Sequence, residues 1–125
     1  LIVCGIDLND FKIINDTYGH EKGDEILIKF MGVFKSEIDK DDILGRSGGD
    51  EFIVVFVNKS KKQVIEIINR ISNKLKNYDL GLNSNINGIS FAYGLSEFLS
   101  DSDDAKELLK IADRRMYEKK SLMKK

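Results

Sequence analysis

Three acidic residues stand where this sequence could bind a hard metal ion. Asp7 ends a short apolar run that is typical of a buried strand, and Asp50 and Glu51 lie at the tip of a predicted hairpin. Carboxylates at neighbouring strand ends can converge on one point, where their oxygens suit a divalent cation such as Mg²⁺. Two such cations about 3.5–4 Å apart clamp the attacking and leaving oxygens of phosphoryl transfer. The alternative is structural, with Asp7 capping a helix and the other two acids filling a turn.

Gly48 and Gly49 precede this acidic pair and separate two apolar, β-branched runs. A Gly-Gly step between such runs is typical of a tight hairpin turn, because that turn needs positive φ. Glycine also lets the backbone approach a ligand closely, so a phosphate or a base could lie against this turn.

Hydrophobic periodicity predicts the elements that must position these residues. We expect strands over residues 1–6, 43–47, 51–57 and 89–98. We expect helices over residues 11–18, 24–38 and 60–75, the last capped by Ser60, and a final helix capped by Ser102 or Asp103. This β-α-α-β-β-α-β-α order, with its central hairpin, excludes an all-parallel sheet. The predicted fold class is α/β, more closely an α+β sandwich, with a mixed, largely antiparallel central sheet flanked by helices.

Composition restricts the classes of function. The 125 residues suit one domain, and 42% hydrophobic with 33% charged residues is typical of a globular chain. A net charge of −1 gives no overall field that would attract nucleic acid or an anionic membrane, so we expect neither partner for this domain. The single cysteine, Cys4, excludes an internal disulfide and a CxxC zinc site, and His20, the only histidine, is interpreted as structural. No apolar run reaches the length of a membrane span.

The stretch from residue 7 to residue 24, DLNDFKIINDTYGHEKGD, resembles the substrate-binding segment of GGDEF domains, the diguanylate cyclases. Residues 46–52, RSGGDEF, carry the motif that names the family, with Gly48 and Gly49 in its hairpin. Residues 89–94 and 108–117 resemble the family's late strand and last helix. The resemblance covers nearly the whole chain in order. It implies one GGDEF domain over residues 1–125, with a fold similar to the palm of polymerases and nucleotide cyclases.

The resemblance implies a nucleotidyltransferase that condenses two GTP into cyclic di-GMP and releases two pyrophosphates. Each 3′-hydroxyl attacks the α-phosphate of the other GTP. One domain holds one GTP, so catalysis requires a two-fold homodimer. Two Mg²⁺ or Mn²⁺ ions are expected at each half-site. The alternative is a catalytically silent module that binds GTP or a partner protein for regulation, and Asp24 disfavours a cyclase that acts on ATP.

By position, the resemblance assigns metal binding to Asp7, to Asp50 and to the backbone carbonyl of Leu8. Glu51 is implied as a further metal ligand or as the group that deprotonates the 3′-hydroxyl, which a bound metal would assist. Lys12 joins Asp50 and Glu51 in the implied catalytic set.

The same resemblance assigns the nucleotide contacts. Asn15 and Asp24 match the positions that read guanine, whose Watson–Crick edge offers donors to a carboxylate and further groups to an amide. The backbone amides of Asp10 and Phe11 match a phosphate cradle at a helix start. The basic residues at phosphate-binding positions are Lys12, Lys120 and Lys124.

Several positions depart from the family pattern. An Arg-x-x-Asp inhibitory site falls on residues 39–42, where Asp39 holds the arginine position and Asp42 keeps the aspartate. A carboxylate there repels a phosphate, so we predict no product inhibition at this site. Arg115 stands where the last helix usually has a small residue.

The family's N-terminal segment with its first helix, and its closing strand, have no counterpart in these 125 residues. We therefore expect a piece of a longer protein, with a sensory or receiver domain upstream. We expect the domain to be cytoplasmic, with any membrane anchor of the native protein in other segments. Loss of the first helix would uncover apolar surface and weaken dimerisation.

Overall fold

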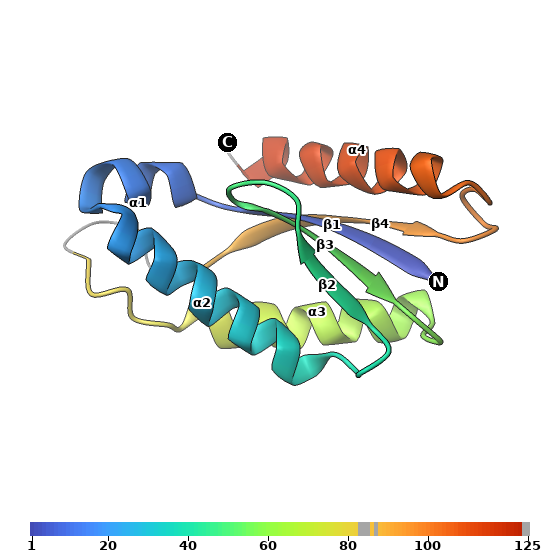
Figure 1. Ribbon diagram of the computed structural model, residues 1–125, viewed down its shortest axis with the longest axis horizontal. Helices are drawn as coiled ribbons and strands as arrows, with labels where there is room; N and C mark the ends of the chain where they lie inside the picture. The colour runs from blue at the N-terminus through green and yellow to red at the C-terminus, as the bar shows by residue number, and fades with distance from the viewer. Residues whose placement is uncertain (83–85, 87, 124–125) are drawn as a thin grey trace.

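The computed structural model describes residues 1–82, 86 and 88–123. Its strands are β1 (Ile2–Leu8), β2 (Ile43–Arg46), β3 (Glu51–Phe56) and β4 (Phe91–Glu97). Its helices are α1 (Phe11–Tyr18), α2 (His20–Glu37), α3 (Lys61–Lys76) and α4 (Ala105–Met123). Figure 1 shows these elements, whose order along the chain is the predicted one.

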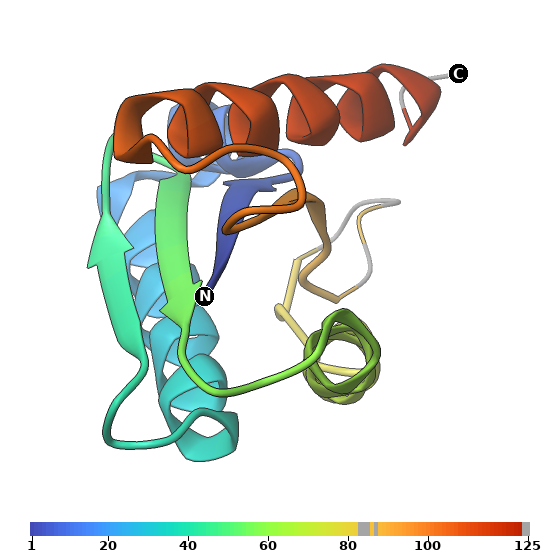
Figure 2. The same cartoon turned by 90° about the vertical axis from the view of Figure 1, so that its right-hand side faces the viewer.

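The strands form a single sheet in the order β2-β3-β1-β4, and each neighbouring pair of described strands is antiparallel. Figure 2 shows α4 along one face of this sheet and α2 with α3 along the other. This three-layer arrangement confirms the predicted α+β sandwich with a largely antiparallel sheet.

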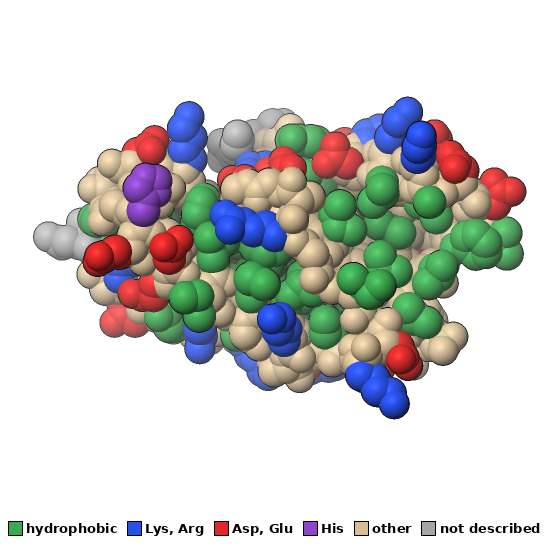
Figure 3. Space-filling view, viewed as in Figure 1, with side chains coloured by type: hydrophobic (Ala, Val, Ile, Leu, Met, Phe, Trp, Pro, Cys, Tyr) green, Lys and Arg blue, Asp and Glu red, His purple; other side chains and the backbone are tan. Residues whose placement is uncertain are grey.

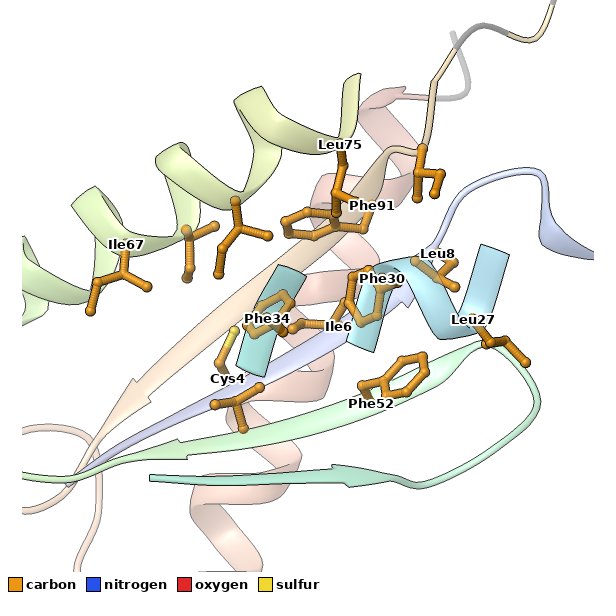
Figure 4. Packing of buried hydrophobic residues seen from close by; sticks show 14 of the residues in the cluster. Cys4, Ile6, Leu8, Leu27, Phe30, Phe34, Phe52, Ile67, Leu75 and Phe91 are labelled. Carbon is orange, nitrogen blue, oxygen red and sulfur yellow. The ribbon is translucent and has the colours of Figure 1, made fainter. Parts of the chain in front are cut away.

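Strand β1 is buried along its whole length because it lies between two partner strands and between two helical layers. Side chains alternate along a strand, so Cys4, Ile6 and Leu8 point into the core under α2 and α3. Figure 4 shows this core, in which the ring of Phe30 lies 4.8 Å from that of Phe52 and 5.7 Å from that of Phe91. The side chain of Asp7 therefore lies on the other face of the sheet, which α4 covers.

Two glycines that pair across β1 and β4, Gly5 and Gly94, allow α4 to lie directly on the sheet. A Cβ atom on Gly94 would lie 2.7 Å from the carbonyl carbon of Arg115 and closer still to backbone atoms of Ala112 and Met116. The corresponding atom on Gly5 would lie at an ordinary 3.5 Å from Ala112. Gly94 thus sets the distance between α4 and the strands.

The element boundaries differ from the expectations in two places that matter for function. Strand β1 continues through Asp7 to Leu8, and α2 begins at His20 rather than at residue 24. The N-cap of α1 is Asp10, so the structural alternative in which Asp7 caps a helix is wrong. The predicted cap at Ser60 is confirmed, since its side chain accepts the backbone N–H of Gln63 at 3.2 Å.

The hairpin between β2 and β3 forms as predicted, but the reason given for its glycines is wrong. Neither Gly48 nor Gly49 adopts positive φ. The connection is a longer loop over residues 47–50, in which the Ser47 N–H donates to the carbonyl of Glu51 at 2.9 Å. The Arg46 guanidinium donates to the carbonyls of both glycines, at 2.8–3.1 Å, and fixes the loop from outside.

The α4 side of β2 and β3 carries an open apolar surface. Figure 3 shows hydrophobic side chains gathered over these strands and toward α4. Ile43 and Leu109 are exposed, and Ile53 lies with Leu109 in a hollow of about 310 Å³ between β3 and α4. Within the described part of the chain, no helix has the length and apolar character needed to span a membrane.

Candidate functional site

Asp7 is the centre of the candidate site. It is only 4% exposed, and it pairs in register with Glu51 across β1 and β3. Both side chains belong to the face of the sheet that α4 covers. From that helix the Lys120 ammonium reaches within 2.7 Å of Asp7 Oδ1, so two acids and one base meet at the end of the sheet.

The pKa of Asp7 reflects its burial and its charged neighbours. Burial raises the pKa of this carboxyl most, the negative charges of Asp50 and Glu51 raise it further, and Lys120 opposes them. Oδ1 is buried, and the Lys120 ammonium lies 2.7 Å from it as an ion-pair partner. A buried carboxylate needs a cation beside it, and Lys120 supplies that cation here.

The loop of residues 47–50 brings Asp50 to the end of β1. The N–H of Leu8 donates to the backbone carbonyl of Asp50 at 2.9 Å, which fixes the loop against the strand. Asp50 and Glu51 are both half-buried. The charges of both act on Asp7, so the three predicted metal-binding acids share one region of the structure.

These residues suit a hard divalent cation by their donor chemistry. Carboxylate and carbonyl oxygens are the ligands that Mg²⁺ and Mn²⁺ prefer, and Asp7 Oδ1 already attracts one cation, the Lys120 ammonium at 2.7 Å. Across the described residues, however, no three acidic, histidine or cysteine side chains stand close enough together to form a ready metal site. Asp7, Asp50, Glu51 and the Leu8 carbonyl remain the predicted ligands.

Two of the predicted phosphate-binding residues, Asp10 and Lys120, line a cleft beside this centre. Asp10 has a left-handed backbone, with φ of 62°, and its side chain does not cap α1, so the helix start has no side-chain acceptor from its N-cap. A cleft of about 450 Å³ opens there, lined by Asn9, Asp10, Ser90, Lys120 and Met123. Lys120 therefore borders both Asp7 and the cleft, and Lys12 is exposed on the first turn of α1. Lys124 lies outside the described residues.

The predicted guanine residues stand on either side of the α1–α2 junction. The Asn15 carbonyl accepts the N–H of Gly19 at 3.0 Å. A Cβ atom on Gly23 would collide with Asn15 Oδ1, so the Asn15 side chain lies against the residue that precedes Asp24. Asp24 itself is exposed and lines a shallow hollow on α2.

The position of Arg115 has a structural explanation that the sequence did not reveal. Its guanidinium donates two hydrogen bonds of 2.9 Å to the carboxylate of Asp101 and one of 2.7 Å to the carbonyl of Leu95. This pair lowers the pKa of Asp101 to about 2, aided by the N–H of Glu97. Arg115 thus fixes α4 to the end of β4.

The segment at residues 39–42 is also occupied by structural contacts. Asp42 accepts hydrogen bonds from the N–H groups of Val57 and Asp39, at 2.8 and 2.9 Å. The Lys59 ammonium lies 2.8 Å from Asp42 and 2.7 Å from Asp39. Although burial opposes it, these partners lower the pKa of Asp42. The aspartate of the expected inhibitory site is therefore committed to the fold.

Sequence reasoning missed one side chain at the site, Tyr117. Its hydroxyl donates to Oε1 of Glu51 at 3.2 Å, and the charge of Glu51 raises the pKa of Tyr117, so the phenol keeps its proton. Tyr117 stands three residues before Lys120, on the same face of α4. The three-residue spacing could have revealed Tyr117 in the sequence, since residues one turn apart on a helix face the same side.

A comparison with protein families matches residues 1–125 to the family described as diguanylate cyclase, GGDEF domain. The chain belongs to this family. Diguanylate cyclase A of Treponema denticola is 32% identical to this GGDEF domain over 120 residues, which are 96% of the chain and 32% of that protein. Diguanylate cyclase DosC of Escherichia coli is 36% identical over 118 residues, 94% of the chain and 25% of DosC. The chain thus spans a third or less of these curated relatives.

Solved GGDEF structures confirm the fold. The active GGEEF domain of a diguanylate cyclase from Vibrio cholerae shares 30% identity and a TM-score of 0.83, over 96% of this chain and 76% of that one. The GGDEF domain of TpbB from Pseudomonas aeruginosa shares 28% identity and a TM-score of 0.86, over 97% and 71%. A sensory box/GGDEF family protein from Caulobacter crescentus shares 29% and a TM-score of 0.80, over 96% and 78%.

Proposed function

We propose that this GGDEF domain is the catalytic domain of a diguanylate cyclase. It would convert two GTP into one cyclic di-GMP and two pyrophosphates. The observation that carries the proposal is the register pair of Asp7 and Glu51 at the end of the sheet, with the Lys120 ammonium 2.7 Å from Asp7. The family match and the curated diguanylate cyclases support it.

Each half of the reaction forms one bond and breaks one. The 3′-oxygen of one GTP bonds to the α-phosphorus of the other, and the bond from that phosphorus to pyrophosphate breaks. Glu51, half-buried beside Asp7, is the proposed acceptor of the 3′-hydroxyl proton. Two Mg²⁺ ions, held by Asp7, Asp50, Glu51 and the Leu8 carbonyl, would supply Lewis-acid stabilisation of the charge on the phosphate oxygens.

The remaining residues bind and orient the nucleotide. The amides of Asp10 and Phe11, at the uncapped start of α1, would hold the terminal phosphates, and the lysines at positions 12 and 120 would neutralise their charge. Asn15 and Asp24 would read guanine. Adenine would leave those polar groups unpaired, so GTP is favoured over ATP.

One domain has one such site, so the reaction requires two chains whose sites face each other. We propose that an upstream sensory or receiver domain controls the reaction, because such a domain can set the geometry of the pair. The Caulobacter relative described as a sensory box/GGDEF protein supports this arrangement.

A second candidate function is a silent module that binds GTP or a partner protein without turnover. The favouring observation is that no group of three metal-ligating side chains is assembled in the described residues. In that case nucleotide would bind and pyrophosphate would not be released.

Pyrophosphate release separates these functions. The chain is incubated with Mg²⁺ and either GTP or ATP at chain concentrations spanning a hundredfold range. The proposed cyclase releases pyrophosphate from GTP much faster than from ATP, with a rate per chain that rises with concentration as dimers form. GTP binding without pyrophosphate release at any concentration would contradict the proposal and favour the silent module.

A further inference from the structure

One residue at the candidate site has no assigned role, and it contacts the acid proposed to accept the proton. Tyr117 comes from α4 and its hydroxyl donates to Oε1 of Glu51 at 3.2 Å. Tyr117 is 49% exposed, so it contributes little to the core. Its hydroxyl is therefore placed for a contact at the surface of the site rather than for packing.

The packing of α4 fixes where this hydroxyl lies. Gly94 allows the helix backbone to rest on β4, and Arg115 ties the helix to Asp101 and to the carbonyl of Leu95. One and two residues further on, the helix presents Met116 to the core and Tyr117 to the end of β3. Three residues after Tyr117, Lys120 meets Asp7. A single helix face thus contacts both acids of the register pair.

The hydrogen bond leaves one oxygen of Glu51 for chemistry. Oε1 is engaged by the tyrosine, and Oε2 lies over Gly48, where a Cβ atom would be 3.5 Å away. Oε2 is therefore turned toward the loop of residues 47–50, which carries Asp50. Because Asp7 and Asp50 are both negative, an unrestrained Glu51 would be driven toward solvent, away from its neighbours.

We propose that Tyr117 is a positioning residue for Glu51. Its hydroxyl holds Oε1 so that Oε2 is presented to the metal and the nucleotide. The inference rests on the proposed function, because it assigns Glu51 to the site at which GTP and metal bind. Tyr117 acts through Glu51 and does not itself contact the reacting atoms.

The test measures metal dependence rather than turnover alone. Binding of a non-hydrolysable GTP analogue is titrated by calorimetry at a series of Mn²⁺ concentrations, and the Mn²⁺ concentration that gives half-maximal binding is recorded. Tyr117→Phe removes only the hydroxyl. We expect it to raise that concentration about tenfold, the usual effect of losing a group that orients a metal ligand. Thermal unfolding of the variant should match that of the unaltered chain.

Two further variants make the test specific. Tyr93→Phe removes a hydroxyl on the opposite face of the sheet, where the ring lies under Lys119, and should leave the Mn²⁺ dependence unchanged. In a chain that already carries Glu51→Gln, Tyr117→Phe should have no further effect, because both changes act on the same carboxylate.

The outcomes separate this inference from the proposed function. An unchanged Mn²⁺ dependence in Tyr117→Phe, or an equal change in the Glu51→Gln background, would overturn the role of Tyr117. An unaltered chain that binds the analogue with Mn²⁺ but makes no cyclic di-GMP would contradict the proposed activity, while the Mn²⁺ dependence still decides on Tyr117. An unaltered chain that binds no analogue with Mn²⁺ would overturn both.

Discussion

Replacing Gly94 with alanine should move α4 and expose how strongly the site depends on that helix. The new methyl group would lie 2.7 Å from the Arg115 carbonyl carbon and closer still to two other backbone atoms of α4. Carbon atoms in ordinary contact lie about 3.5 Å apart or more, so α4 must move away from β4 by roughly 1 Å. Backbone atoms cannot rotate away as a side chain can, and the helix must shift as a unit.

The magnitude follows from two opposing effects. Overpacking of this kind costs about 1–3 kcal/mol, and the upper end applies because the obstructing atoms are backbone. Alanine regains about 0.5–1 kcal/mol, because glycine loses more conformational freedom on folding. We expect a net loss of about 2 kcal/mol in the free energy of unfolding, which a domain of ordinary stability survives. The 1 Å shift would carry Tyr117 and Lys120 away from the acids and lower GTP turnover about a hundredfold.

Gly5→Ala is the matched control, because Gly5 is the register partner of Gly94 and its Cβ position lies 3.5 Å from Ala112. Urea denaturation and cyclic di-GMP production are measured for both variants. Gly5→Ala should stay within about 0.5 kcal/mol of the unaltered chain and keep its activity. Equal stability and equal turnover in the two variants would refute the reasoning.

Three other predictions concern the ion pairs. Asp101→Asn should lower the free energy of unfolding by about 1 kcal/mol near neutral pH, a value discounted because the Arg115 side chain is 38% exposed. The pKa of Asp101 is about 2 in the folded chain, below its unfolded value, so the carboxylate stabilises the fold less as the pH falls. Urea denaturation of both chains should therefore show the difference in stability shrinking from about pH 4 downward. By the same assay, Asp42→Ala should lower the free energy of unfolding by about 3 kcal/mol, because Lys59 and the N–H of Val57 lose their buried partner. Asp39→Ala removes a carboxylate that is 71% exposed and should lower it by less than about 1 kcal/mol. Added cyclic di-GMP should not slow turnover through residues 39–42, and product inhibition that Asp39→Ala abolishes would contradict this.

Local sequence patterns were sufficient to predict the order of the elements. Helix α1 has the predicted bounds, and the cap at Ser60 forms, because both depend on residues within one turn of each other. The antiparallel fold followed from the central hairpin. The family motifs also placed Asp7 and Glu51 at one site, which the β1–β3 register supports.

What the sequence could not show depends on tertiary contacts. The conformation of Gly48 is set by the Arg46 guanidinium and by the strand it leads into, so the glycine pair alone misdirected the expectation of positive φ. The roles of Arg115 and Tyr117 depend on how α4 crosses the sheet. Gly94 allows that crossing because it has no Cβ atom to collide with the backbone of α4. The helical pattern gave the inward face of α4 but not the strand residues that it meets.

The most direct test of the account is the formation of cyclic di-GMP. The chain is incubated at high concentration with GTP and Mg²⁺, the nucleotides are separated by chromatography, and Asp50→Ala is treated in parallel. The backbone carbonyl of Asp50 accepts the N–H of Leu8, a contact that alanine keeps, so the variant should fold. The half-buried side chain of Asp50 is a proposed metal ligand, so the variant should lose turnover. Cyclic di-GMP from the unaltered chain alone is the predicted result. Equal product from both chains would contradict the assignment of the acidic site.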